Sequence, residues 1–228
     1  MMTLSRMAVY SNSTMSVAHP PALTQETLAR GVSFLITTDR RLARIHAEFG
    51  PPPLWARTPG FPTLVHIILE QQVSIASAKA AFLKLQQAIS RVRPEAFLDL
   101  DDGELKRIGF SRQKAEYCRG LARAVTSGEL DLKRVRLMDD DSARAELMRL
   151  RGIGRWTADI YLLMCLLRPD VWPSGDMALA VSYQRVSGLR SRPHTEALAK
   201  HAERWRPWRA VAARFLWHDY LSRLGGSP

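Results

Sequence analysis

The 228-residue sequence predicts an all-α protein. Apolar residues recur at helical spacing along most of the chain, whereas neither period-two alternation nor an Asn-Gly hairpin turn is evident. Apolar side chains make up 46% of the residues, which is enough to form a buried core. Short connections between roughly ten helical segments favour an architecture of helices packed on helices.

The first two helices are expected to begin at polar capping residues. Thr24 precedes "QETLARGVSFLITT", and Asp39 precedes "RRLARIHAEF", which ends at Gly50 and Pro51. The Pro/Gly-rich segment "PPPLWARTPGFP" then predicts a linker at a domain boundary. In the helix expected after it, "TLVHIILEQQVS", the apolar stripe comprises Leu64, Ile67, Ile68 and Val73.

The rest of the chain continues in helical segments. "SIASAKAAFLKLQQAI" ends before Pro94, and two short segments, "PEAFLDL" and "DGELKRIG", come next. Ser111 is expected to cap "RQKAEYCRGLARAVTSG", and either Asp141 or Ser142 to cap "ARAELMRL". The remaining helices are "MALAVSYQRVSG", "TEALAKHAERW" and "PWRAVAARFLWHDYLSRL", with Pro207 in the first turn of the last.

Composition narrows the class of partner and the compartment. Lys and Arg number 33 against 22 Asp and Glu, a net charge of +11, which favours nucleic acid first and a membrane surface second. No apolar stretch approaches the ~20 residues of a membrane span, and residues 1–20 lack a secretory apolar segment. We therefore expect a cytoplasmic protein with a disordered start and no membrane association. Two cysteines, Cys118 and Cys165, are too few for a four-thiolate iron–sulfur cluster and suit buried free thiols.

The segment "LRGIGRW" carries a candidate anion site. Gly152 and Gly154 permit a tight turn between two helices, while Ile153 packs inward. Since the next helix begins at Gly154 or Arg155, its free N–H groups point out of the turn toward an anion. The alternative is an ordinary glycine-containing helix–helix turn. "LKRIGFSRQKA" offers a weaker second hairpin, and its alternative is a capped helix start.

Four separated segments together resemble one family. "LRGIGRWTADIYLL" followed by "RPDVWPSGDMAL" is similar to the helix-hairpin-helix DNA glycosylases of the HhH-GPD superfamily, in its alkylbase (3-methyladenine type II) branch. "ILEQQVSIASA", "IGFSRQKAEY" and "ERWRPWRAVAARFLW" match the same branch in the same order. The resemblance runs from about Phe61 to Leu221. It implies a two-lobed fold with the active site in the cleft between the lobes.

The resemblance assigns the catalytic role to Asp176. Cleavage of an N-glycosidic bond builds positive charge on the sugar, which a nearby carboxylate stabilises, and the same group can orient the attacking water. The alternative for Asp176 is a helix N-cap, and both roles are compatible. Trp156 stands where bifunctional relatives have a lysine nucleophile, so release of the base without strand cleavage is implied.

Further residues match the family's base pocket and its DNA contacts. The pocket candidates are Trp156, Trp217, Tyr161, Trp172 and Ile160; the last replaces a tyrosine of some relatives and implies a roomier pocket. For the two matched tryptophans, plain core packing is the alternative. Gln72 matches the residue that enters the duplex to fill the gap left by the flipped nucleotide, and Gln71 is expected to support that loop from inside.

The hairpin region is implied to hold DNA phosphate through Gly152, Gly154, Arg155 and Thr157. The main-chain carbonyls of Met148, Leu150 and Ile153 match those that hold a structural sodium or potassium ion in relatives. Arg151 replaces a common proline. Asp159 is expected to be a buried structural acid, and the aspartates at 139–141 a solvated capping cluster. No cofactor is implied to be required.

These observations predict a monofunctional DNA glycosylase that removes alkylated purines of the 3-methyladenine type from duplex DNA by base flipping. The expected lobes are residues 21–58 with 168–228, and residues 59–167, which carry the hairpin. Double-stranded DNA is the expected partner of a monomeric protein. The alternatives are a non-catalytic binder of damaged DNA and a glycosylase/lyase for another lesion.

Overall fold

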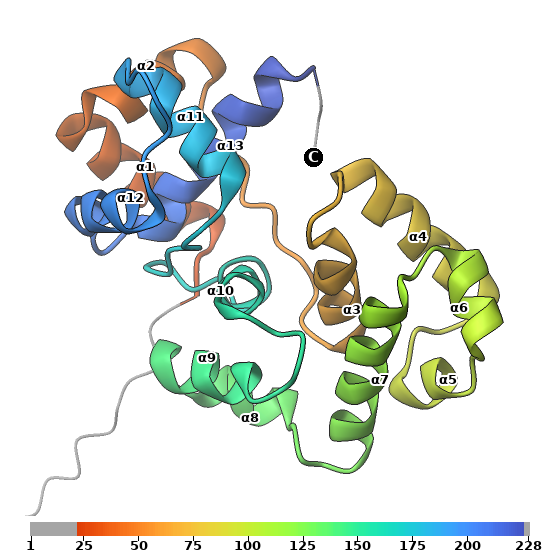
Figure 1. Cartoon of the computed structure of the whole chain (residues 1–228). Helices are drawn as coiled ribbons and strands as arrows, with labels where there is room; N and C mark the ends of the chain where they lie inside the picture. The colour runs from red at the N-terminus through yellow and green to blue at the C-terminus, as the bar shows by residue number, and fades with distance from the viewer. Residues whose placement is uncertain (1–21, 226–228) are drawn as a thin grey trace, which may run out of the picture.

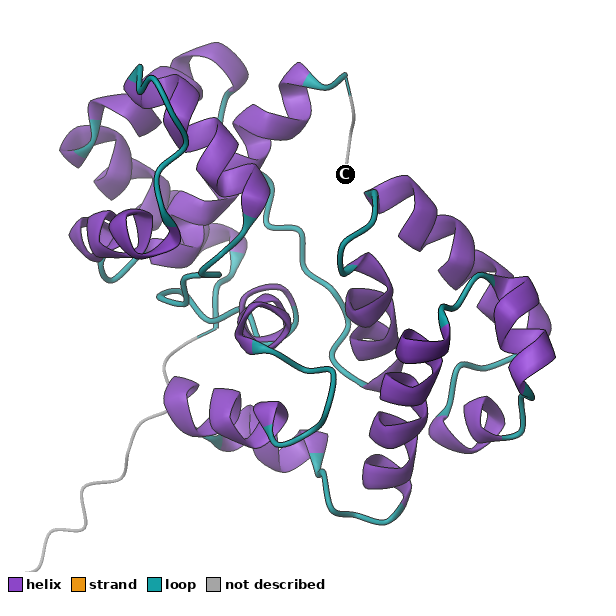
Figure 2. Cartoon of the chain, in the orientation of Figure 1, coloured by secondary structure: helices purple, strands orange, loops and turns teal. Residues whose placement is uncertain are grey.

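The described residues, 22–225 of a computed structural model, form helices and no strands (Figure 2). The expectation of disorder for residues 1–20 lies outside this range. The helices are α1 (Gln25–Thr38), α2 (Arg40–Phe49), α3 (Phe61–Glu70), α4 (Ile75–Ala88), α5 (Pro94–Leu98), α6 (Asp102–Ile108), α7 (Arg112–Thr126), α8 (Leu132–Leu137), α9 (Asp140–Met148), α10 (Arg155–Met164), α11 (Met177–Ser187), α12 (Thr195–Ala202) and α13 (Arg209–Arg223), with a 3₁₀ turn at Glu203–Trp205. The all-α prediction is confirmed. Over the described residues, none of these helices is long and apolar enough to cross a membrane.

The helices pack in two groups (Figure 1). One group joins the beginning and the end of the described chain, because α1 and α2 pack on α11 and α13. The other group runs from α3 to α10, with α7 packed on α3 and α5, and α10 on α3 and α9. The segment between α2 and α3 has no helix and passes from the first group to the second (Figure 1).

A buried arginine ties the two groups together. Arg214 of α13 has no solvent exposure, and it donates to the main-chain oxygens of Leu54, Leu163 and Ala210 at 2.8–3.0 Å. Burial lowers the pKa of Arg214 to about 9, because the charged form loses its hydration. The guanidinium thus links the connecting segment, the end of α10 and α13, which meet beside the site described below.

Three of the predicted helix caps are confirmed, and one is wrong. Thr24, Asp39 and Ser111 each accept a main-chain N–H of the following helix. Ser74, for which no cap was predicted, caps α4 in the same way. The predicted caps Asp141 and Ser142 are wrong. Asp139 is the cap, since its carboxylate accepts the N–H groups of both of those residues at 3.0 and 2.9 Å.

Two other local predictions fail. Pro207 was placed in the first turn of the last helix, but α13 begins at Arg209 with Trp208 as its N-cap. Val73 was placed on the apolar stripe of the helix after the linker, but α3 ends at Glu70. Because it follows the turn, the Val73 side chain is 47% exposed rather than buried. Cys118 and Cys165 are buried and unpaired, as expected.

Candidate active site and DNA-binding hairpin

The turn between α9 and α10 has the geometry of an anion-binding hairpin. Gly152 has φ +92°, Ile153 is 4% exposed and packs inward, and Gly154 is the N-cap of α10. The first α-helical bond joins Ala158 N–H to Gly154 O, so the amides of residues 155–157 precede it and have no acceptor within the helix. These amides and the positive end of the helix dipole suit a phosphate oxygen.

Gly152 is also required by its surroundings. A Cβ placed on it would lie 2.2 Å from Cγ of Tyr117, so the Tyr117 ring occupies the space that any side chain at 152 needs. The positive φ adds a second reason, because L-residues with a side chain are strained there. The turn glycine was evident in the sequence, whereas the supporting role of Tyr117 on α7 was not.

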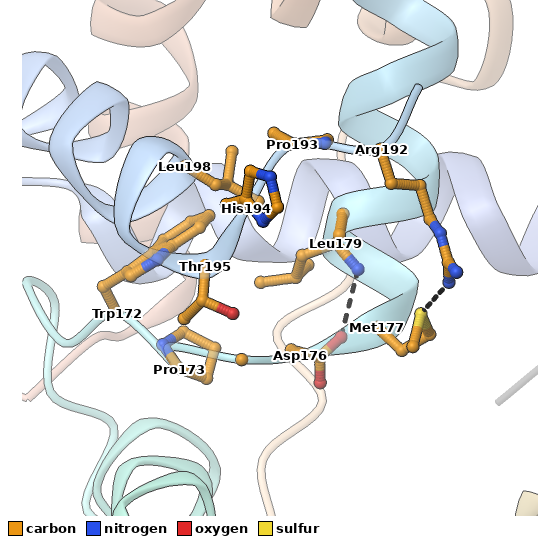
Figure 3. Close-up of a pocket in the computed structure, with 12 residues that line it drawn as sticks. Trp172, Pro173, Asp176, Met177, Leu179, Arg192, Pro193, His194, Thr195 and Leu198 are labelled. Carbon is orange, nitrogen blue, oxygen red and sulfur yellow. Dashed lines mark hydrogen bonds between the residues drawn. The ribbon is translucent and has the colours of Figure 1, made fainter. Parts of the chain in front are cut away.

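Asp176 is the N-cap of α11 and points toward α10 and α13. Its Oδ1 accepts the main-chain N–H of Leu179 at 3.0 Å, as the capping alternative expected (Figure 3). Trp156 Nε1 donates to its Oδ2 at 2.9 Å, and Trp217 Nε1 donates to its Oδ1 at 3.2 Å. One half-buried carboxylate therefore receives three N–H donors from three helices.

These bonds change the interpretation of the two tryptophans. Each directs the N–H edge of its indole at Asp176, so each orients the carboxylate whatever its ring face contacts. Trp156 lies in the first turn of α10, two residues after Gly154. The 2.9 Å bond consequently places the carboxylate directly beside the helix that begins at the hairpin. Trp217 is 7% exposed, and the packing expected for it is also present.

A cavity of about 330 Å³ adjoins Asp176 on the side of the 192–198 segment (Figure 3). Its walls include Trp172, Pro173, Met177, Arg192 and His194. Trp172 is the pocket candidate that lines this cavity, and its indole also packs against Trp205 with 5.5 Å between ring centres. Trp156, Trp217 and Ile160 are not among its lining residues. The two tryptophans that donate to Asp176 therefore do not line the cavity beside it.

Two predicted site residues are corrected because α10 is surrounded by other helices. Tyr161 has no solvent exposure, so it is a core residue and not part of an accessible pocket. Thr157 is 2% exposed and its hydroxyl accepts a bond from Gln71, so its side chain cannot contact phosphate. Thr157 remains a phosphate candidate only through its main-chain amide. Ile160, one turn beyond Trp156, is 4% exposed.

Asp159 is buried, as expected, and it is held by arginines. Arg144 Nε donates to its Oδ1 at 2.6 Å, and Arg155 Nε lies 3.7 Å from its Oδ2. Burial raises the pKa of Asp159, and the ion pair with Arg144 opposes this effect. The Arg155 side chain keeps 63% exposure in this ion pair, so it is accessible to solvent beside the hairpin. Among the aspartates at 139–141, Asp141 is exposed and pairs with Arg144, whereas Asp140 lies 3.4 Å from buried Arg168.

The turn after α3 presents the predicted wedge residue. Gln72 is exposed and has φ +57°, so the backbone reverses direction at this residue. Val73 and Ile75, which follow it, are 47% and 53% exposed. Gln71 is turned inward and donates to Gly152 O and Thr157 Oγ1, both at 2.9 Å, which agrees with the internal support expected of it.

The carbonyls proposed to hold a monovalent cation lie where α9 gives way to the hairpin. Met148 is the last residue of α9, and carbonyls at a helix end lack intrahelical partners. Leu150 O accepts Ile153 N–H at 3.1 Å and keeps its second lone pair. Main-chain oxygens are suitable ligands for a hard cation, so the residues present fit a sodium or potassium ion.

Comparisons with known proteins agree with this geometry. Residues 65–207 match the HhH-GPD superfamily of base excision DNA repair proteins. The chain is 26% identical over 182 residues to DNA-3-methyladenine glycosylase 1 of Schizosaccharomyces pombe, covering 78% of this chain and 80% of that protein. It is 31% identical over 123 residues to a DNA-3-methyladenine glycosylase of Bacillus subtilis, covering 54% of this chain and 41% of that protein. The chain spans 65% of another Bacillus subtilis relative, at 27% identity.

Solved structures have the same fold. The 3-methyladenine DNA glycosylase of Schizosaccharomyces pombe, in complex with abasic DNA, superposes with a TM-score of 0.73 at 25% identity, covering 82% of this chain and 95% of that one. The DNA-3-methyladenine glycosidase of Bacillus halodurans gives 0.70 at 28% identity, covering 86% and 91%. An 8-oxoguanine glycosylase/lyase of Clostridium acetobutylicum gives 0.73 at 13% identity, which shows only a common fold.

Proposed function

Because the chain belongs to the HhH-GPD superfamily of base excision DNA repair proteins, we propose that it is a monofunctional DNA glycosylase for alkylated purines. One observation carries the proposal: Trp156, in the first turn after the hairpin, donates to the carboxylate of Asp176 at 2.9 Å. A phosphate held at the hairpin would therefore bring an extruded nucleotide to this carboxylate. The 3-methyladenine glycosylases among the relatives support alkylated bases as the substrate class.

The reaction needs one carboxylate. As the bond between C1′ and the purine nitrogen breaks, its electron pair leaves with the base and positive charge develops on the sugar. Asp176 stabilises that charge, and a water molecule adds its oxygen to C1′ while Asp176 or solvent takes up the proton. A purine alkylated at N3 or N7 is already cationic, so it departs without a protein acid. The products are a free base and an abasic site in an intact strand.

The chain's charge and its exposed turn support DNA as the partner. The net charge is +11, and Arg155 keeps a largely exposed side chain beside the hairpin amides. We assign phosphate contact to the main chain at Gly152 and Gly154 and to Arg155, and insertion into the duplex to Gln72. A relative bound to abasic DNA supports DNA as the partner. Monomeric state, a cytoplasmic location, and a structural cation held by Met148, Leu150 and Ile153 carbonyls remain part of the proposal.

One assay separates this function from its two alternatives. Alkylated duplex is incubated with the protein, and the strand is analysed with and without alkali. A monofunctional glycosylase releases free base and leaves breaks that appear only after alkali. A lyase breaks the strand directly, whereas a non-catalytic binder retains the DNA and releases nothing. Direct strand breakage or the absence of free base would refute the proposal.

Removal of divalent metal is expected to leave activity unchanged. The proposed chemistry uses a carboxylate and water, and any cation at the hairpin would be monovalent and held by carbonyl oxygens. Base release should therefore proceed at an unaltered rate in excess EDTA at constant ionic strength. A complete loss that Mg²⁺ or Zn²⁺ restores would assign a catalytic role to a divalent ion.

The two indoles are expected to raise the turnover number by orienting Asp176. Replacing Trp156 or Trp217 with phenylalanine keeps an aromatic ring but removes one N–H donor to the carboxylate. A hydrogen bond to a charged group contributes roughly 1.5–3 kcal/mol, so kcat should fall about tenfold or more for each variant. Affinity for undamaged duplex should stay near that of the wild type.

A third indole provides the matched control. Trp205 Nε1 donates to the carboxylate of Asp39 at 3.0 Å, so its N–H is not among the donors to Asp176, although its ring packs against Trp172. Trp205→Phe removes the same kind of bond, so it should lower the melting temperature while leaving kcat of the folded protein unchanged. If Trp156→Phe and Trp217→Phe behave like Trp205→Phe, the indoles stabilise the fold and do not orient Asp176.

A further inference from the structure

A lysine on α7, a helix distant in sequence, holds the turn that carries Gln72. Lys114 Nζ, on α7, donates to Leu69 O and to Gln71 O, both at 2.7 Å. These two carbonyls lie at the end of α3, where helical partners are missing. The ammonium therefore fixes the backbone on the N-terminal side of Gln72. Burial lowers the pKa of Lys114, because the charged ammonium loses part of its hydration.

Hydrogen bonds from the side chain of Gln71 also join this turn to the hairpin. The amide nitrogen of Gln71 donates to Gly152 O and to Thr157 Oγ1 at 2.9 Å, across 81 and 86 residues of sequence. A carboxamide NH₂ has two hydrogens, so both are used. One bond reaches the turn glycine and the other reaches the first turn of α10. The exposed Gln72 thus follows a residue whose main chain and side chain are both restrained.

One face of α7 supports both structures. Lys114 and Tyr117 are three residues apart on this helix and therefore lie on the same side. Lys114 holds the turn after α3, and the Tyr117 ring lies directly against Gly152. The turn that carries Gln72 and the hairpin turn at Gly152 therefore both contact α7.

We propose that Gln71 and Lys114 are positioning residues that hold Gln72 at a fixed distance from the hairpin, so that insertion and phosphate binding act as one rigid unit. This inference rests on the proposed function. Extrusion of a paired base costs a few kcal/mol, and an inserted side chain offsets part of that cost only if it is already in place. Without these restraints, the turn at Gln72 would have to become ordered each time the protein binds DNA. The benefit of the two residues should therefore be greatest where a stable base pair must be opened.

The test compares paired and unpaired lesions. Gln71→Met keeps side-chain length, Lys114→Met shortens the side chain by one atom, and both remove the donors. Single-turnover excision of an alkylated purine is measured opposite its normal partner and opposite an abasic-site analogue, where no pair has to be broken. Both variants should be slower by about tenfold on the paired duplex, the effect of one or two lost hydrogen bonds. On the unpaired lesion they should come within about threefold of the wild type.

Three controls distinguish positioning from general damage. Lys133→Met removes a positive charge from an exposed side chain on α8 and should match the wild type on both substrates. Lys114→Arg keeps a cationic donor and should restore most of the rate. Gln72→Ala should show the same selective defect, and Gln71→Met with Gln72→Ala should be no slower than Gln72→Ala alone. Equal rate losses on both substrates would overturn the proposal. So would a rate loss in the double variant equal to the product of the two single losses.

A second readout separates this inference from the proposed function. In an Asp176→Asn background, fluorescence of 2-aminopurine at the target position reports extrusion without chemistry. Gln71→Met and Lys114→Met should reduce the fluorescence gain on binding, whereas Lys133→Met should not. If the wild type releases no base yet these changes are seen, the function fails and the positioning role stands. If the fluorescence gain is unaffected in both variants, the positioning role fails even though bases are released. Because the two variants lie on different elements, failure of one to fold leaves the other as the test.

Discussion

Replacement of Asp176 with asparagine is expected to abolish base release while leaving the fold and duplex binding in place. Asparagine keeps the shape and still caps α11, because its oxygen can accept the N–H of Leu179. It removes the negative charge that stabilises the positive charge developing on the sugar. Loss of a single preorganised electrostatic group costs about 10²–10³ in kcat, and loss of the full charge should cost at least that much.

The substitution also tests the indole arrangement. Asparagine offers one acceptor oxygen where the carboxylate offers two, so one of the bonds from Trp156 and Trp217 is lost. A stability loss of roughly 1 kcal/mol is expected from this change. Asp139→Asn is the matched control, because Asp139 is also an N-cap aspartate but lies at the start of α9. Single-turnover release and thermal unfolding measure the two effects. Wild-type release by Asp176→Asn would remove Asp176 from the mechanism.

Replacement of Gly152 with alanine is expected to disrupt the hairpin and to weaken binding to any duplex. The added methyl group would meet the Tyr117 ring at 2.2 Å, and the residue would be held at φ +92°. The backbone strain alone costs roughly 1–2 kcal/mol, and displacement of the half-buried Tyr117 ring adds to it. If the hairpin amides hold phosphate as proposed, affinity for undamaged duplex should fall by about tenfold or more.

Gly128 provides the control for backbone strain. It has φ +78°, and a Cβ placed on it would meet nothing within 4 Å. Gly128→Ala should therefore lose about 1 kcal/mol of stability through strain and keep full affinity for DNA. Thermal unfolding and duplex titration at one fixed salt concentration measure both variants. Equal behaviour of the two alanine variants would mean that contact with Tyr117 does not position the hairpin.

The sequence predicted those features that depend on neighbouring residues. Thr24, Asp39 and Ser111 cap helices because a side-chain oxygen needs to reach only two or three residues along the chain. The turn at Gly152 and Gly154 was predictable because a tight turn favours glycine, and Gly152 has a positive φ. Neighbouring candidates still compete: the α9 cap was predicted at Asp141 or Ser142, and Asp139 takes it.

Residues brought together from distant parts of the chain were decided only by the tertiary structure. The tryptophans at 156 and 217 were predicted near Asp176, but sequence spacing holds no information on whether a ring presents its face or its N–H edge. Tyr161 has the residue type of a pocket wall, yet helices on every side of α10 bury it. Nothing in the sequence distinguishes Lys114 from a surface lysine. Only the packing of α7 places its ammonium at the end of α3.

The sequence alone therefore determined the all-α class, most helix starts, the glycine hairpin and the carboxylate at 176, because each follows from local preference or from a short motif. Only the packed structure decided which groups hold that carboxylate, which cavity adjoins it and what supports the turn at Gln72. Those features arise from contacts across 20 to 86 residues of sequence, and their geometry is set by how whole helices pack.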